Sequence, residues 1–425
     1  MKINVLKGMY DVLPEEVVFW QFIEKTVRET AALFGYGEIR TPILERTELF
    51  KRGSGIGTDI VKKEMYIFED RGGRSVTLRP EGTPSVVRAY LQSGVTSQGE
   101  IAKLFYIAPM FRYEKPQKGR FRQHVQFGAE CFGIKNPAID AEMIIFLLTI
   151  YARLGLKGFV LELNNVGCGK KECRESVRKG IKDFVSGKTN SMCDDCKLRL
   201  EENPLRILDC KKEGCIEILS GFEGTDSLAC ESCRSYYKEL KDLLSANAMP
   251  FVENSRLVRG LDYYTAVVFE VTASGLGSQN AIGGGGRYDN MVKELGGPDV
   301  PAVGFGAGIE RVIMALKSQC PDFPVSTATD VFVVYQGEKA LKKVLFILNT
   351  LRLKLNISAK AAFGKSMKAQ MRTANKLKSK YCIIVGDEEI NKGVFKLKNM
   401  ESGEEKEITE NNLKSIRQLF RGKNE

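Results

Sequence analysis

The segment 109–133, PMFRYEKPQKGRFRQHVQFGAECFG, combines side chains that can bind a negatively charged ligand. Successive side chains of a strand point to opposite faces, so a strand here would place every second residue on one surface. That surface would carry the side chains of Arg120, Arg122, His124, Gln126 and Glu130. Arg112 and Glu114 share their parity, and Pro116 and Gly119 predict the turn of a hairpin.

This polar surface predicts a site for a phosphate-rich ligand. Guanidinium groups bind phosphate bidentately, so Arg112, Arg120 and Arg122 together suit a triphosphate. Glu130 can accept a hydrogen bond from an N–H group of the ligand. The plainer interpretation is a surface strand held by cross-strand ion pairs.

Two further segments carry polar groups that suit a ligand. In LRPEGTPSVVRAY, Glu81 and Thr83 flank a glycine, and their carboxylate and hydroxyl form a receptor for an ammonium group. Turns are rich in such residues, so this signal is weak on its own. In LVRGLDYYT, Arg259 precedes Tyr263 and Tyr264, whose hydroxyls need partners if they are buried.

The run GGGGRYD, residues 283–289, contains Tyr288 and lacks the Lys-Ser/Thr ending of a P-loop. Four glycines permit close approach of the backbone to a ligand or a strand, and they are equally compatible with a flexible turn. Further along, Arg311 begins an amphipathic helix in GAGIERVIMAL.

The cysteines cluster in one part of the chain. Eight of the eleven fall between 168 and 233, and they include two C-x2-C pairs, Cys193 with Cys196 and Cys230 with Cys233. This spacing lets two thiolates reach one tetrahedral ion, so these four cysteines are candidate ligands for structural zinc. The C-x4-C pairs in the same region are weaker signals. Reduced thiols without metal remain the alternative.

The elements that must position these residues can be read from periodicity. Helices are expected over 15–34 and 138–154, and strands over 38–50 and 256–272. Residues 302–316 predict a final apolar strand and helix. A linker is expected over 318–329. Beyond the linker, strands and helices alternate, with strands at 331–336, 381–386 and 394–399 and helices at 338–354, 366–378 and from about 410, which predicts a small α/β domain.

The chain is strongly basic toward its C-terminus. From Asp330 to Glu425 there are 20 Lys and Arg against 11 Asp and Glu, and between Lys339 and Gly386 there are 12 basic residues and no acid. A stretch of one sign is typical of a surface that binds a nucleic-acid backbone. A merely basic surface is the alternative.

Composition sets the broad class of the protein. With 425 residues the chain predicts two or three domains, and 43% hydrophobic with 28% charged residues is ordinary for a soluble protein. No apolar run approaches the roughly 20 residues that span a bilayer, and the N-terminal segment lacks a signal-peptide h-region. We therefore expect a cytoplasmic protein that has no membrane partner.

These motifs resemble a known family. The blocks FGYGEIRTPILE, FRYEKPQKGRFRQHVQFGAE and VGFGAGIERV resemble motifs 1, 2 and 3 of class II aminoacyl-tRNA synthetases, and LVRGLDYYT with GGGGRYD resembles the signature of the histidyl-tRNA synthetases. The resemblance implies an α+β catalytic domain on a mostly antiparallel sheet flanked by helices, over 1–325. A cysteine-rich insertion domain over 167–248 would interrupt it, and a C-terminal α/β anticodon-binding domain would occupy 330–425.

The resemblance also implies an activity in protein biosynthesis. Such an enzyme ligates L-histidine to its tRNA through a histidyl-adenylate, releasing AMP and pyrophosphate, with ATP as substrate and Mg2+ accompanying it. Arg112 would hold the α-phosphate, and Arg259 would stabilise the charge that develops there. Arg120 and Arg311 would bind the β- and γ-phosphates and the adenine face. Glu114 is also expected at the ATP.

For the amino acid, the resemblance implies that Glu81, Thr83 and Gln126 bind the α-amino group. Glu130 and Tyr264 would read the imidazole, with Tyr263 and Tyr288 nearby. A site of paired polar groups rejects analogues that lack the partner, so no editing domain is needed.

One position departs from the family pattern. The family usually has an aromatic residue followed by histidine after the Arg-Gln of motif 2, whereas this chain has His124-Val125. Strand parity places His124 where the aromatic side chain would stack on adenine, so we expect His124 to pack on that ring. Motif 1, with Pro42, implies a homodimer.

Two other functions use related domains. A synthetase-like regulatory subunit of ATP phosphoribosyltransferase would bind ligands without charging tRNA, but such paralogues typically lack the basic C-terminal domain and parts of the histidine signature. A synthetase-like sensor of uncharged tRNA would belong to a larger kinase, and no kinase segment is present. The sequence favours the ligase.

Overall fold

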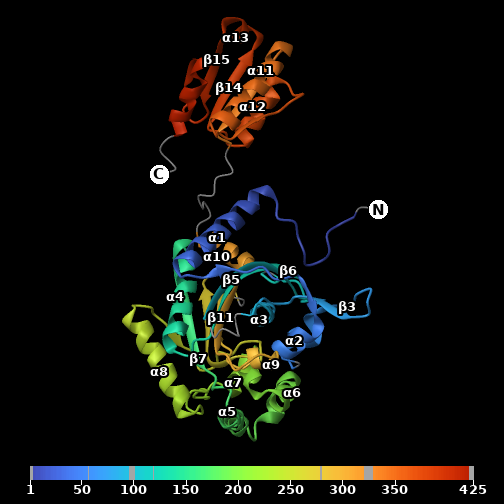
Figure 1. The fold of residues 1–425 in the computed structure, drawn as a ribbon, viewed down its shortest axis with the longest axis vertical. Coiled ribbons are helices and arrows are strands. Elements are labelled where there is room, and N and C mark those ends of the chain that lie inside the picture. The colour runs from blue at the N-terminus through green and yellow to red at the C-terminus, as the bar shows by residue number, and fades with distance from the viewer. Residues whose placement is uncertain are drawn as a thin grey trace. The chain divides into compact units, whose positions relative to one another are not determined.

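The computed structural model describes residues 3–55, 57–94, 101–117, 119–277, 280–319 and 329–420. The chain divides into two compact units, Met1–Phe323 and Pro324–Glu425 (Figure 1). Most of the linker expected over 318–329 lies outside the described residues. Within the described residues, no helix is long and apolar enough to cross a membrane.

The first unit is built on an eight-stranded sheet. Its strands, in spatial order, are β1 (Gly37–Glu38), β5 (Ala102–Phe111), β6 (Gln123–Phe132), β11 (Ala302–Gly308), β10 (Ala281–Arg287), β9 (Thr265–Ala273), β7 (Phe159–Asn165) and β8 (Val252–Glu253). Of these strands, the outermost pairs, β1 with β5 and β7 with β8, are parallel. The six central strands run antiparallel to one another. The mostly antiparallel sheet expected from the sequence is therefore confirmed.

Four helices supply most of the apolar packing against this sheet. They are α1 (Pro14–Leu33), α4 (Pro137–Arg153), α8 (Glu231–Ala246) and α10 (Ile309–Gln319). Proline occupies the first turn of α1, where its missing N–H costs nothing, and acidic Glu15 and Glu16 follow it. The Asn136 side chain caps α4 by accepting from the N–H of Ala138 at 2.8 Å. Both N-termini are thus set by local sequence, and both helices match the expected ranges closely.

A three-stranded sheet and short helices lie beside the large sheet. The strands are β2 (Leu44–Arg46), β4 (Ser75–Leu78) and β3 (Tyr66–Glu69), and the helices are α2 (Thr47–Gly53), η1 (Ile60–Glu64), α3 (Thr83–Gln92) and α9 (Met291–Glu294). The single strand expected over 38–50 is wrong. Two short strands flank Pro42, and the chain turns into α2 at Thr47, which lets Phe50 become fully buried.

The expected strand over 256–272 begins later, at Thr265. Residues 256–264 instead form an irregular segment that contains Gly260, and this segment carries Arg259 and Tyr263. Glycine weakens a strand because it loses more backbone entropy and offers no side chain to pack.

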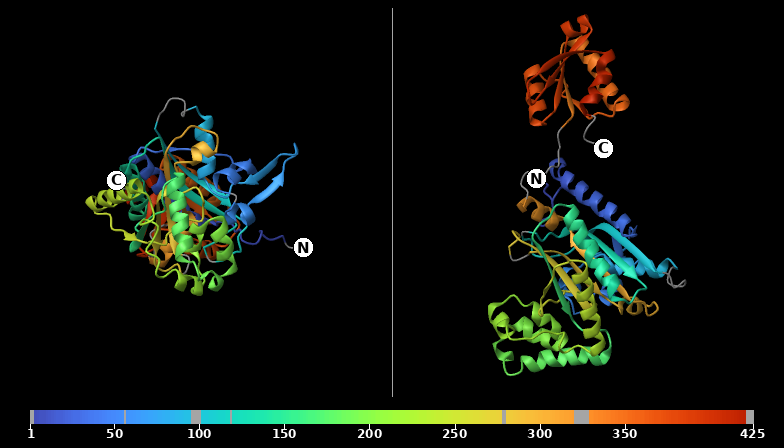
Figure 2. Two further views of the ribbon diagram at one scale, coloured as in Figure 1. Left: turned by 90° about the horizontal axis from the view of Figure 1, so that it is seen from below. Right: turned by 90° about the vertical axis from the view of Figure 1, so that its left-hand side faces the viewer.

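The segment between β7 and β8 folds into helices with a small core of its own. They are α5 (Lys171–Phe184), η3 (Thr189–Ser191), α6 (Asp194–Glu202), η4 (Pro204–Asp209), α7 (Glu213–Ile218) and then α8. Helices α5, α6 and α7 gather at one end of the large sheet (Figures 1 and 2), whereas α8 packs beside α4. The helical structure expected for the cysteine-rich segment is confirmed. Its helices contact the irregular segment 256–264 through a hydrogen bond from Asn203 to Asp262, and Arg206 donates to Asp59 in a neighbouring loop.

The second unit is a small α/β fold, as expected. Its strands, in spatial order, are β13 (Ala359–Ala361), β12 (Val331–Gln336), β14 (Tyr381–Gly386), β15 (Val394–Asn399) and β16 (Glu405–Thr409). The helices are α11 (Glu338–Asn349), which continues into the wider turn η5 (Thr350–Lys354), α12 (Met367–Lys376), α13 (Asp387–Lys392) and η6 (Asn411–Phe420). Helix α13 was not expected, and the final helix is a tighter 3₁₀ helix. Side chains of α11 pack on one face of the sheet and those of α12 on the other.

Candidate functional site

Strand β6 carries polar side chains that lie over the glycines of the neighbouring strand β11. It pairs with β11 so that Gln126, Gly128 and Glu130 stand opposite Gly308, Gly306 and Gly304. A Cβ atom on Gly306 would lie 1.8 Å from Nε2 of Gln126, and one on Gly304 would lie 1.8 Å from Oε2 of Glu130. Glycine is therefore required on β11 for the two polar side chains to lie across the sheet.

This packing makes a direct prediction for Gly306→Ala. The new methyl group needs the space that the Gln126 amide occupies, so the amide must swing away. If Gln126 binds the amino group of an amino acid, as the resemblance implies, the Michaelis constant for that amino acid should rise about 10-fold or more, since loss of one polar contact is worth about 1–3 kcal/mol. Gly37→Ala is the control, because it replaces a strand glycine of β1 where a Cβ atom would meet only the carbonyl oxygen of Lys103, at 4.0 Å. Equal kinetic constants for the two variants would contradict the role that the resemblance implies for Gln126.

Seven of the residues singled out from the sequence line one cavity of about 180 Å³. They are Arg112, Glu114, Arg120, His124, Gln126, Arg259 and Arg311. The cavity also borders a larger one of about 740 Å³, which shares its four arginines and reaches the helical insertion at Asp195, Lys211 and Lys212. Residues from motif 2, from the segment before β9 and from α10, far apart in the chain, thus meet at one place.

The arginines of this cavity are held in position by the protein. Arg112 donates from Nε to the carbonyl oxygen of Pro80 at 2.8 Å. Arg311 donates to the carbonyl oxygens of Gly119 and Ala281 at 3.1 and 2.9 Å. Because these side chains are already oriented, an anion entering the cavity meets fixed positive charge.

Two arginines at the cavity pair with carboxylates. Arg120 forms an ion pair with Glu114 at 3.1 Å, and Arg259 donates to Glu270. The Nε atom of Arg259 is buried and has no hydrogen-bond partner within the described part of the chain, and neither has Oε1 of Gln126. A buried polar atom without a partner is costly, so both atoms are suited to a bound ligand.

His124 is the single histidine of the chain, and it is half-buried at the cavity wall. Burial, together with the positive charges of Arg112 and Arg311, lowers its pKa from 6.5 to about 3. The ring is therefore neutral at pH 7. A neutral imidazole can stack on an aromatic ligand without adding repulsion between cations.

Two carboxylates form a buried polar network beside the cavity. Glu130 is 0% exposed, and it accepts hydrogen bonds from Thr83 at 2.7 Å and from Tyr288. Burial raises its pKa to about 8, against the lowering effect of these two hydrogen bonds. Glu81 accepts from Tyr263 at 2.9 Å and from Ser54, and burial raises its pKa too.

Not all predicted site residues line the 180 Å³ cavity. Apart from Arg122, six do not, namely Glu81, Thr83, Glu130, Tyr263, Tyr264 and Tyr288. Five of them form the buried network. Tyr264 packs against Tyr263, with ring centroids 4.6 Å apart, and both tyrosines line a separate cavity of about 530 Å³.

Arg122 does not join the other arginines, contrary to the sequence-based expectation for a triphosphate site. Its guanidinium lies 3.9 Å from the ring centroid of Tyr113 and donates to the carbonyl oxygen of Glu114 at 3.3 Å. Regular strand geometry begins at Gln123, so strand parity does not extend back to Arg122.

Four side chains at the site were missed by the sequence interpretation. Ser54 donates to Glu81. The Tyr106 hydroxyl is buried above two glycines, where a Cβ on Gly82 or Gly128 would lie 2.5 Å from it. Phe121 and Glu310 line the 180 Å³ cavity. By strand alternation Phe121 has the opposite parity from Arg120 and Arg122, and Ser54 and Tyr106 stand in segments whose pattern gives no sign of a polar role.

The candidate zinc ligands also lie differently from a single four-cysteine set. Cys193 and Cys196 group with Cys210 and Cys215, whereas the other C-x2-C pair groups elsewhere, with Cys168 and Cys173. The C-x4-C pairs, which were the weaker sequence signals, supply the other half of each group. Spacing alone cannot reveal which pairs meet in space.

Comparison with known proteins gives a consistent result. The family model described as "Histidyl-tRNA synthetase" matches residues 8–312, and the one described as "Anticodon binding domain" matches residues 330–418. A histidine–tRNA ligase of Desulforamulus reducens is 44% identical over 403 residues, which cover 95% of this chain and 96% of that protein. A histidine–tRNA ligase of Syntrophomonas wolfei is 43% identical over 424 residues and the full length of both chains.

Among solved structures, apo histidyl-tRNA synthetase of S. aureus superposes with a TM-score of 0.80 at 33% identity. The match covers 98% of this chain and 100% of that one. A structure described as an ATP phosphoribosyltransferase regulatory subunit/histidyl-tRNA synthetase from Bacillus halodurans has a TM-score of 0.65 at 22% identity, over 91% of this chain and 98% of that one, and this likeness supports the fold alone.

Proposed function

The chain belongs to the histidyl-tRNA synthetase family and joins histidine to its tRNA, and from this premise we propose that histidyl-adenylate forms in the cavity lined by Arg112 and Arg259. The chain has the class II synthetase fold expected from the sequence. The alternative of a regulatory subunit of ATP phosphoribosyltransferase is not supported, because full-length relatives at 43–44% identity are histidine–tRNA ligases.

One observation carries the assignment of the site. Four guanidinium groups, from Arg112, Arg120, Arg259 and Arg311, surround one cavity that the Gln126 amide and the His124 ring also line. ATP brings a triphosphate, a neutral heteroaromatic base and an α-phosphate that must be attacked by a carboxylate. Fixed cations and a neutral ring at the same cavity suit these three groups.

The first step needs two anions to approach each other. The histidine carboxylate attacks the α-phosphorus, and the bond to the β-phosphate oxygen breaks to release pyrophosphate. In our proposal Arg112 holds the α-phosphate, and Arg259 stabilises the negative charge that builds up on it. Arg120 and Arg311 hold the remaining phosphates and the adenine side of the nucleotide. In the second step a terminal ribose hydroxyl of the tRNA attacks the adenylate carbonyl and AMP leaves.

Magnesium is expected to accompany ATP in class II synthetases. Glu114 and Glu270 are carboxylates that border the 740 Å³ cavity beside the four arginines, and oxygen ligands of this kind suit Mg2+. When bound, the ion would neutralise charge on the phosphates. The two carboxylates would then exchange their arginine partners for the ion, which leaves Arg120 and Arg259 available to the nucleotide.

The histidine substrate is proposed to lie against the buried network. Glu81, Thr83 and Gln126 would bind its ammonium group, and Glu130 with Tyr264 would read the two ring nitrogens. Tyr263 and Tyr288 hold the carboxylates in place through hydrogen bonds. A side chain without two hydrogen-bonding nitrogens would leave these buried groups unpaired, which is the physical basis of discrimination.

Pyrophosphate exchange tests this assignment. The assay measures return of labelled pyrophosphate into ATP, which requires adenylate formation and no tRNA. We expect exchange with histidine and with no other standard amino acid. Exchange with several amino acids would contradict the proposed reading of the imidazole, and no exchange at all would contradict the proposed site of adenylate formation.

The His124→Phe variant tests how adenine is bound. A phenyl ring offers a larger stacking area than imidazole, and the native ring is already neutral at pH 7. We therefore expect the Michaelis constant for ATP to stay the same or fall by up to about 3-fold. His124→Ala removes the ring and should raise that constant by about 10-fold, since base–aromatic stacking is worth about 1–3 kcal/mol. A large rise for the phenylalanine variant would contradict stacking.

The second unit is proposed to bind the anticodon stem and loop of the tRNA. Its basic residues are not all free for this role. Lys343 and Lys380 pair with Glu410 and Asp330, and Arg352 donates to the carbonyl oxygen of Ala359. The other nine of the twelve basic residues between Lys339 and Gly386 would contact the phosphate backbone, so the affinity for tRNA should fall as salt rises.

We also propose that the chain forms a homodimer in the cytoplasm. The three-stranded sheet beside motif 1 exposes large apolar side chains, with Ile43, Leu44, Ile67 and Phe68 between 42% and 50% exposed. Such a patch is typical of a protein interface. Sedimentation equilibrium of the purified chain tests the association, and cell fractionation tests the location. The domain limits proposed from the sequence, 1–325 with 167–248 inserted and 330–425, remain part of this proposal.

A further inference from the structure

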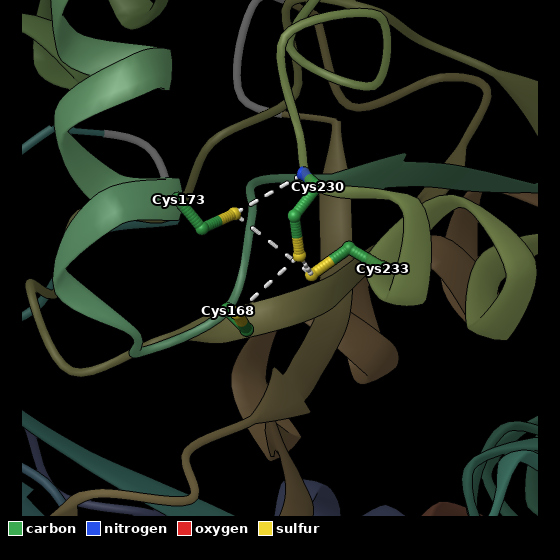
Figure 3. A group of neighbouring side chains, drawn as sticks. All are labelled: Cys168, Cys173, Cys230 and Cys233. Carbon is green, nitrogen blue, oxygen red and sulfur yellow. Dashed lines mark hydrogen bonds between the residues drawn. The ribbon is translucent and has the colours of Figure 1, made fainter.

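The eight cysteines of the insertion form two separate groups of four. In one group the sulfur atoms of Cys168, Cys173, Cys230 and Cys233 all lie within 4.8 Å of one another (Figure 3). In the other, the sulfurs of Cys193, Cys196, Cys210 and Cys215 satisfy the same limit. All eight are free thiols. Each group therefore offers four soft ligands to a single point.

The spacing of the sulfurs matches a tetrahedral metal site. A zinc ion binds each thiolate at about 2.3 Å, which places the sulfurs of a regular tetrahedron about 3.8 Å apart. In the first group, Cys168 and Cys230 are 3.9 Å apart, Cys173 and Cys233 4.0 Å, and Cys230 and Cys233 3.4 Å. In the second, Cys193 and Cys210 are 3.9 Å apart. Iron–sulfur clusters bind thiolates through more than one iron, which spreads the sulfurs farther apart.

The backbone arrangement is the same in both groups. Cys193 and Cys230 immediately precede helices α6 and α8, and the second cysteine of each C-x2-C pair lies in the first helical turn. The N–H of Cys193 donates to Sγ of Cys215, and the N–H of Cys230 donates to Sγ of Cys173, both at 3.4 Å. Amide donors and helix N-termini favour thiolates, which are the form that binds metal.

Packing of reduced thiols does not explain the first group. Its apolar neighbourhood contains Cys173, Cys233 and Ala229 as buried members, with Cys168 and Cys230 beside them. So small a cluster contributes little burial of apolar surface. A bound metal ion would hold these segments together, because the free energy of metal binding would add to the folding free energy of the site.

We propose that the insertion holds two structural zinc ions, one in each group of four cysteine thiolates. Each site would release four thiol protons to solvent and form four Zn–S bonds, with no change of oxidation state. Tetrahedral coordination by four sulfurs suits zinc among the common metals. This proposal goes beyond the catalytic assignment and does not depend on it.

The two ions would stabilise different parts of the structure. The first joins the segment after β7 to the start of α8, and so closes the loop that contains all the other helices of the insertion. Closing a loop of this length removes entropy from the unfolded chain. The second joins α6, η4 and α7, and residues Cys210, Lys211 and Lys212 at this group line the 740 Å³ cavity together with Arg112 and Arg259. It would therefore shape a wall of the catalytic site.

Metal content of the full-length chain tests the proposal. Protein is purified without chelator and without a histidine tag, incubated with zinc, freed of unbound metal and measured by plasma mass spectrometry. We expect two zinc ions per chain. Cys168→Ser/Cys173→Ser and Cys210→Ser/Cys215→Ser should each retain one. The matched control is Cys382→Ala, a buried cysteine of the second unit that lies outside both groups and should retain two.

A titration of the unmodified protein removes the risk that a variant fails to fold. Metal-free protein is titrated with cobalt(II), which reports tetrahedral thiolate coordination by its visible absorption. An end point of two ions per chain, displaced by two of zinc, supports both sites. An end point at zero or one, or bound iron in place of zinc, overturns the proposal. Because no activity is measured, failure of the catalytic assignment would leave this result unchanged.

Discussion

Replacing Arg259 by glutamine is expected to lower histidine-dependent pyrophosphate exchange by about 100- to 1000-fold, the cost of removing one preorganised donor from a developing oxyanion. Arg259 lines the cavity from a segment outside motif 2, and its buried Nε atom has no partner among the residues described by the structure. The guanidinium can therefore add a bond in the transition state. The loss should fall on the turnover number, with a smaller change in the Michaelis constant for ATP.

Arg256→Gln is the matched control for this variant. Arg256 lines the 740 Å³ cavity but not the smaller one, so its removal should leave exchange within about 3-fold. Loss of Arg259 also leaves the Glu270 carboxylate without its partner. The double variant Arg259→Gln/Glu270→Gln removes that stranded charge. Recovery of exchange in the double variant would show that Arg259 serves only to balance Glu270, and would refute a role at the phosphate.

Replacing Glu130 by glutamine is expected to raise the Michaelis constant for histidine by about 100-fold or more. The glutamine has nearly the same shape, but its NH2 group cannot lose a proton, whereas Glu130, with a pKa of about 8, can ionise and then offers two acceptor oxygens. Thr83 and Tyr288 both donate to this side chain, and the substrate ring needs an acceptor as well. Sites built for a hydrogen bond discriminate strongly when the bond is lost. Glu142→Gln, the same change on a surface ion pair of α4, is the control.

The same variant makes a prediction about pH and stability. Burial raises the folded-state pKa of Glu130 from 4.5 to about 8, in the presence of the neighbouring Glu81 carboxyl and the Tyr106, Tyr288 and Thr83 hydroxyls. A raised acid pKa means that this group's contribution to stability is present below pH 4.5 and is lost as the pH rises through about 8.

The glutamine variant has no such loss. Its melting temperature minus that of the unmodified protein should therefore increase by several degrees between pH 5 and pH 9, without substrate. A difference that stays constant across this range would show that Glu130 titrates in the folded protein as it does in the unfolded chain.

Local sequence predicts an element of this fold where the signals that form the element lie within the segment itself. Helices α1 and α4 carry their N-terminal signals and apolar spacing within their own residues, and the hairpin of β5 and β6 follows from alternation around Pro116 and Gly119. The prediction for 38–50 was wrong because the chain turns into α2 at Thr47, and the burial of Phe50 that favours this turn depends on tertiary packing. Helix α13 was missed because it has only six residues and no buried side chain.

Sequence predicted the site residues whose type and local pattern indicate a polar role. Polar and charged side chains in an otherwise apolar strand, such as Gln126 and Glu130, can be identified from the sequence alone. Tyr106 and Phe121 cannot, because an aromatic residue in a strand is ordinarily part of a core. Local spacing could not predict which cysteine pairs meet in space, because this depends on how the helices of the insertion pack together.

The arginine–carboxylate pairs have a consequence for the end of the first step. Glu114 and Glu270 give Arg120 and Arg259 an internal partner to return to once the nucleotide is cleaved. Four bare guanidinium groups would retain pyrophosphate tightly, and product departure would then limit turnover. Competing carboxylates weaken that hold, so we expect the leaving anion to be exchanged for the protein's own groups, with two of the four positive charges neutralised until another nucleotide arrives.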